Sequence, residues 1–104
     1  MKFNYTAKIH SDKQIHLRTT GEISKFANQY EAYIALRKVS DGKILLVANA
    51  KSILEVLLFA GANKGDLEIA ISGVNIDKTR HKADSVIYSE ISQKFEEILE
   101  NYGM

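Results

Sequence analysis

Two side chains near the start of the chain, His16 and Arg18, have the types and spacing that suit the binding of a phosphate group. An imidazole has a reference pKa of about 6.5, so at pH 7 it is largely neutral and can act as a nucleophile or a base. Apolar residues at helical spacing predict a helix within residues 17–30, and the free N–H groups at a helix start stabilise phosphate. The pair therefore suits a phosphoryl acceptor, and the plainer interpretation is a surface-loop histidine beside a solvated arginine.

A second candidate is Ser52, which has the spacing of a capping box with Glu55 at the start of an apolar run that ends at Ala60. Capping alone explains a serine at this position. Phosphorylation of the same hydroxyl is the alternative, because a helix N-terminus tolerates the added negative charge. Thr19 and Glu22 have the same spacing, so the sequence leaves two starts open for the first helix, one directly after His16 and one at Thr19.

Other kinds of chemistry find little support in the composition. The chain has no cysteine, which excludes disulfides, zinc–thiolate sites and iron–sulfur clusters. His10 and His16 bracket a polar loop, but no third ligand stands near them, so we expect no metal site. No nucleotide-binding glycine motif is present, and we expect no cofactor.

Charge and hydropathy limit the kinds of partner. The 104 residues include 14 Lys or Arg and 13 Asp or Glu, a balance that argues against a nucleic-acid-binding protein. Residues 1–40 carry seven Lys or Arg and three Asp or Glu, and this local excess suits one anionic group better than a polyanion. We find no secretory signal and no apolar run of membrane-spanning length, so we expect a cytoplasmic protein without membrane insertion.

The hydrophobic periodicity predicts seven elements in the order β-α-β-β-α-β-α. The two middle strands flank Ser40-Asp41-Gly42, and Asp-Gly is a strong signal for a hairpin turn. The elements are predicted over residues 3–9, 17–30, 32–39, 43–48, 52–60, 67–71 and 86–102.

This order indicates a single α+β domain over residues 1–104, with three helices on one face of a four-stranded antiparallel sheet. A ferredoxin-like split βαβ fold with an added helix and an open-faced β-sandwich share the order, and periodicity does not separate them. One apolar face of each element should form the core. The predicted core residues are Ile9, Ile23, Phe26, Ile34, Leu36, Val56, Leu57, Ile69, Ile71, Ile91, Phe95 and Ile98.

The segments around His16 and Ser52 resemble the two motifs of the HPr family, the phosphocarriers of the bacterial phosphoenolpyruvate:sugar phosphotransferase system. Residues 15–18, Ile-His-Leu-Arg, are similar to the acceptor motif Gly-(Leu/Ile)-His-Ala-Arg-Pro-Ala, with Thr19 at the proline position. Residues 49–53, Asn-Ala-Lys-Ser-Ile, are similar to the second motif, Asn-x-Lys-Ser-Ile-Met-Gly-Val. The resemblance covers residues 9–73 and implies an HPr-like open-faced β-sandwich.

The resemblance also implies a phosphocarrier rather than an enzyme. His16 would accept a phosphoryl group from enzyme I and pass it to an EIIA domain for sugar transport, and Arg18 would contact the phosphate. Ser52 would be the regulatory site of the HPr kinase/phosphorylase, with a CcpA-type regulator downstream. The alternative is an HPr-fold regulatory module that binds partners without phosphotransfer from histidine.

Overall fold

The computed structural model describes residues 3–9, 15, 17–61, 65–73 and 84–103, so the predictions for His10 and for the side chain of His16 lie outside the described residues. Within that part of the chain, strands and helices follow each other in the predicted order. Their bounds are β1 Tyr5–Lys8, α1 Leu17–Ala27, β2 Tyr33–Ser40, β3 Lys43–Asn49, α2 Ile53–Ala60, β4 Asp66–Ser72 and α3 Asp84–Tyr102.

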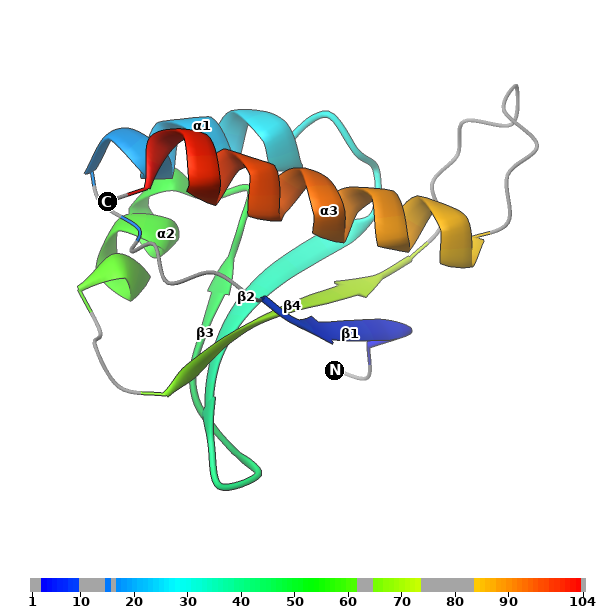
Figure 1. Cartoon of the computed structure of the whole chain (residues 1–104), viewed down its shortest axis with the longest axis horizontal. Helices are drawn as coiled ribbons and strands as arrows, with labels where there is room; N and C mark the ends of the chain where they lie inside the picture. The colour runs from blue at the N-terminus through cyan, green and yellow to red at the C-terminus, as the bar shows by residue number, and fades with distance from the viewer. Residues whose placement is uncertain (1–2, 10–14, 16, 62–64, 74–83, 104) are drawn as a thin grey trace.

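The four strands form one sheet in the order β1-β4-β2-β3, and every neighbouring pair is antiparallel. The order places β1 and β3 at the two edges. A ferredoxin-like split βαβ sheet has its first strand inside, so that alternative is wrong. The three helices lie on one face of the sheet, as predicted (Figure 1).

The core lies between this sheet and the helices. On the central strands Ile34 stands opposite Ile71 and Leu36 opposite Ile69, and all four are fully buried. Alternation along a strand sends such residues to one face, which is why the period of two predicted them. The other predicted core residues are also buried, except for two on the helices.

The two exceptions are Leu57, which is 41% exposed, and Ile98, which packs against the core only in part. In α2 only Val56 and Phe59 point into the core. Leu57 follows Val56 by one residue, a turn of about 100° around the helix, and so faces outward. Because α2 is apolar nearly all round, its sequence does not indicate which face is buried.

The hairpin between β2 and β3 turns at Asp41 and Gly42, as predicted. Their φ angles are 51° and 75°, the left-handed values that a primed two-residue turn requires and that Asp-Gly readily adopts. The register of the pair shifts between Lys38 and Val39, where β3 carries an extra residue, Leu45, as a β-bulge.

Candidate functional site

Helix α1 begins at Leu17, the residue that follows His16 in the chain. Of the two starts that the sequence leaves open, the one at Thr19 is therefore wrong. Thr19 is fully buried, and its Oγ1 donates a hydrogen bond to the carbonyl oxygen of Tyr102 at 2.9 Å. The last carbonyls of α3 have no partner within their own helix, so one of them can accept this bond. A contact between two helices thus replaces the local cap that the sequence spacing predicted.

The start at Leu17 places the positive end of the α1 dipole directly after His16 in the sequence. The N–H groups of a first helical turn have no intrahelical acceptor, and the first turn of α1 contains no acidic residue. Together these features make the start of α1 suitable for an anion.

Arg18 stands exposed in the same turn, with its guanidinium carbon 5.7 Å from the centre of the Tyr102 ring. Figure 1 shows why the two meet, because the last turn of α3 lies beside the first turn of α1. A guanidinium stacked on an aromatic face keeps its in-plane N–H donors directed outward. Tyr102 therefore lies against Arg18 in the first turn of α1.

Ser52 is the N-cap of α2, as predicted, and is half-buried. Its Oγ accepts a hydrogen bond from the backbone N–H of Glu55, with an N···O distance of 3.4 Å. The other half of the predicted capping box differs. The Glu55 carboxylate accepts from the N–H of Asn49 at 3.1 Å, while the N–H of Ser52 donates to the carbonyl of Asn49 at 3.0 Å.

Hydrogen bonds that the sequence does not predict connect the turn before Ser52 to α1. Ser24 Oγ and Asn28 Nδ2 both donate to the carbonyl oxygen of Lys51, at 3.0 and 3.1 Å. The Lys51 ammonium donates to the carbonyl oxygen of Tyr30 at 2.5 Å. Helix α1 therefore positions both Arg18 and the start of α2.

Helix α2 exposes four large apolar side chains, those of Ile53, Leu54, Leu57 and Leu58. Leu57 is predicted from the sequence to lie in the core, and the exposure of the other three is not predicted. The signal was present in the run Ile-Leu-Glu-Val-Leu-Leu-Phe-Ala, which is too apolar for an ordinary surface helix. Exposed apolar surface of this kind is typical of protein–protein contact sites.

The family of the chain follows from its sequence as a whole. A family model described as the phosphorylation site of the PTS HPr component matches residues 4–87. The chain belongs to the HPr family. The members of this family are phosphocarriers rather than enzymes, and the predicted HPr-like fold is confirmed. Comparison with curated protein sequences finds no match.

Two solved structures illustrate the HPr-like fold. The histidine-containing phosphocarrier protein of a mycoplasma is 20% identical, with a TM-score of 0.52 over 91% of this chain and 94% of that protein. Crh of Bacillus subtilis, a catabolite repression protein that forms an intertwined, domain-swapped dimer, is 16% identical, with a TM-score of 0.53 over 100% of this chain and 99% of Crh.

Among the residues that the structure describes, the HPr-like chain has no helix long and apolar enough to cross a membrane.

Proposed function

We propose that this HPr-family protein is a phosphocarrier of the sugar phosphotransferase system, in which His16 accepts a phosphoryl group from enzyme I and passes it to an EIIA domain. The start of α1 at Leu17 carries the proposal. The influence of a helix dipole falls off within one turn, so a start at Thr19 would have moved its positive end away from His16. The observed start supports the proposal, because it gives the positive end of the helix dipole to the residue that directly follows His16 in the sequence.

The transfer requires a neutral imidazole at His16. One ring nitrogen uses its lone pair to form the bond to phosphorus while the bond between phosphorus and enzyme I breaks. In the transfer to EIIA, the bond between the His16 nitrogen and phosphorus breaks while a new bond forms between phosphorus and the acceptor group of EIIA. The transferred group carries its negative charge onto His16, where the amides of the first turn and the Arg18 guanidinium stabilise it.

Docking of both partners is assigned to the exposed apolar side of α2. Ile53 and Leu57 are one turn apart on α2 and exposed, and α2 packs against α1. A partner that covers these side chains would also approach the start of α1. The cytoplasmic location expected from the sequence is part of this proposal.

Incubation with enzyme I and radiolabelled phosphoenolpyruvate tests the proposal. We expect an acid-labile phosphoryl adduct that is lost in His16→Ala and formed more slowly in Arg18→Ala. His10→Ala and His81→Ala replace the other two histidines of the chain and serve as matched controls. The absence of an adduct on the wild-type protein, or its persistence in His16→Ala, would overturn the proposal.

The geometry of Ser52 supports a second, regulatory candidate function, in which the HPr kinase/phosphorylase phosphorylates this residue and a CcpA-type regulator binds the product. The hydroxyl lies at the start of α2, where the helix dipole favours added negative charge. The opposing influence is Glu55, whose backbone N–H bonds to Ser52 Oγ and whose carboxylate belongs to the same turn.

Treatment with the kinase and ATP separates the two functions. Phosphorylation should disappear in Ser52→Ala, and Glu55→Gln should accelerate it because one like charge is removed. A protein that accepts phosphate at Ser52 but none at His16 would be a regulatory module. A protein that accepts none at Ser52 would leave this second function without support.

A further inference from the structure

Strand β3 exposes an unusual amount of apolar surface for a strand at the edge of a sheet. Four consecutive residues, Ile44, Leu45, Leu46 and Val47, are 37 to 52% exposed, and we refer to them as the β3 strip. Outside the strip and α2, the described residues include only one other exposed large apolar side chain, Val86 on α3. Edge strands are normally protected by charges, and an unprotected apolar edge is a site of association.

The other edge of the sheet shows the normal protection. Strand β1 has four residues, and Lys8 at its end pairs with Asp66 of β4 at 3.6 Å. Thr6 and Lys8 alternate with apolar residues there, so the exposed positions of β1 are polar. The β3 strip has no such charge within it.

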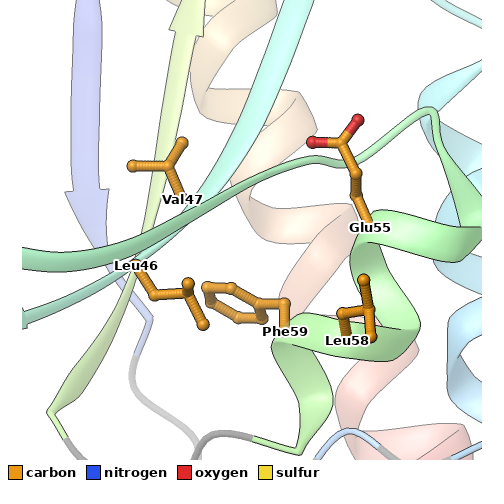
Figure 2. A pocket seen from close by; sticks show the side chains of 5 residues that line it. All are labelled: Leu46, Val47, Glu55, Leu58 and Phe59. Carbon is orange, nitrogen blue, oxygen red and sulfur yellow. The ribbon is translucent and has the colours of Figure 1, made fainter.

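The strip is apolar on both faces of the sheet. Leu46 stands opposite Lys38 on the face that α2 covers, and Val47 stands opposite Arg37 on the other face. Between the strip and α2 lies a groove of about 160 Å³, lined by Leu46, Val47, Glu55, Leu58 and Phe59 (Figure 2). A cavity of about 150 Å³ holds benzene, so this groove has room for one apolar side chain.

Opposite charges stand at the two ends of the strip. Lys43 is exposed at the start of β3. At the far end, the Glu55 carboxylate accepts the hydrogen bond from the N–H of Asn49. The N–H of the next residue, Ala50, donates to Ile34 of β2, and successive N–H groups of a strand point to opposite sides. The N–H of Asn49 and the Glu55 carboxylate therefore lie on the free edge of the sheet.

We propose that the β3 strip is the contact surface for a second copy of this chain, related to the first by a two-fold axis through the middle of the strip. Such an axis reverses the direction of β3 and superimposes the apolar strips. It brings Lys43 of each copy to Glu55 of the other, so that an ammonium group meets a carboxylate at both ends of the contact. A surface that is complementary to itself in this way forms a closed dimer rather than a filament.

Side chains rather than a continuous strand ladder carry this contact. The β-bulge at Leu45 interrupts the regular backbone spacing of β3, and Glu55 already occupies the outward N–H of Asn49. An apolar side chain of the second copy enters the groove beside Leu58. Ile53 and Leu57 are not part of this contact, so the dimer leaves these two side chains of α2 available for the proposed docking.

The first test measures the association of the full chain by sedimentation equilibrium from about 5 to about 500 μM. The wild-type protein should change from monomer to dimer over this range. Leu45→Lys should raise the dimer dissociation constant at least about tenfold, because it buries an unpaired charge in the contact. Val86→Lys is the matched control, since Val86 and Leu45 are equally exposed, at 50%.

Exchanging the charges of Lys43 and Glu55 tests how the two copies are oriented. This test does not require Leu45→Lys to fold. Lys43→Glu or Glu55→Lys alone should weaken the dimer about threefold to tenfold, because each places like charges together twice in the dimer. The double variant should associate within about twofold of the wild type. Circular dichroism confirms that each monomer is folded.

Two results would overturn the proposal. A wild-type protein that stays monomeric throughout the range would show that something other than a second copy covers the strip. A dimer that Val86→Lys weakens as much as Leu45→Lys, or that the double charge variant fails to restore, would show that the contact lies elsewhere.

Discussion

The hydroxyl of Thr19 donates a hydrogen bond to the main-chain carbonyl of Tyr102 at 2.9 Å, between residues 83 positions apart in the sequence. This bond joins the first turn of α1 to the last turn of α3. The ring of the same tyrosine lies against the guanidinium of Arg18. The end of α3 thus supports the start of the helix on which the proposed phosphate site depends.

Replacing Thr19 by valine should loosen the last turn of α3. Valine has nearly the shape of threonine but cannot donate to Tyr102, and losing this partly buried hydrogen bond costs about 1 kcal/mol. Hydrogen exchange at Gly103, whose N–H donates to the carbonyl of Leu99 at 2.7 Å, measures the effect and should accelerate. Thr19→Ser keeps the donor and should leave this exchange near the wild-type rate. Equal acceleration in both variants would contradict the role of the hydroxyl.

The features that the sequence predicted correctly are those decided within a few residues. Asp41 and Gly42 turn the hairpin because of their own backbone preferences, and Ser52 caps α2 because an amide three residues away needs an acceptor. The start of α1 could not be predicted in this way, because the acceptor for Thr19 belongs to the other end of the chain. The hydrogen bond from Thr19 to Tyr102 therefore takes the place of the local cap that the spacing to Glu22 indicates.

The candidate site shows the same difference between features set by local sequence and features set by packing between elements. Arg18 was predicted to accompany an anion from its spacing to His16, but its contact with Tyr102 depends on the packing of α1 against α3. The orientation of Leu57 was also unpredictable, because α2 offers apolar side chains on every side and its buried face is set by β3 and α1.

Two glycine substitutions should change the free energy of unfolding in opposite directions. Gly42 has a φ of 75°, where a side chain is strained, so Gly42→Ala should lower it by about 1 kcal/mol. Gly21 lies inside α1, and an added Cβ there meets no atom within 4 Å. Gly21→Ala should raise the free energy of unfolding by about 0.5 to 1 kcal/mol, because alanine favours the helix. Urea unfolding measures both, and changes of the same sign would refute the argument.

Ser52→Ala should lower the free energy of unfolding by about 1 kcal/mol, since it removes the acceptor for the N–H of Glu55. Ser52→Asp supplies another good N-cap acceptor and should cost less than alanine. Urea unfolding of the three proteins decides. A loss in Ser52→Asp as large as in Ser52→Ala would mean that charge repulsion from Glu55 outweighs the cap.

Lys38 should make the stability rise with pH in the alkaline range. Desolvation by burial lowers the pKa of Lys38 from the ordinary 10.5, against a smaller raising effect of Asp66. Between the lowered pKa and 10.5 the unfolded chain binds more protons than the folded one, so stability increases as the pH rises through that window. Lys38→Met removes the titrating group while keeping much of the side chain. Urea unfolding at several pH values below 10.5 should show a smaller rise in this variant, and identical slopes would contradict the assignment.

Tyr102→Leu should slow phosphoryl transfer from enzyme I about twofold to fivefold, because the ring that holds the Arg18 guanidinium is lost. The bond from Thr19 goes to the main-chain carbonyl and does not require the ring. Tyr102→Phe keeps an aromatic face and should transfer at the wild-type rate. The decisive comparison adds Arg18→Ala to each protein, since the effect of Tyr102→Leu should then disappear if the ring acts through the guanidinium. An equal loss with and without Arg18 would show that Tyr102 contributes only to the stability of the fold.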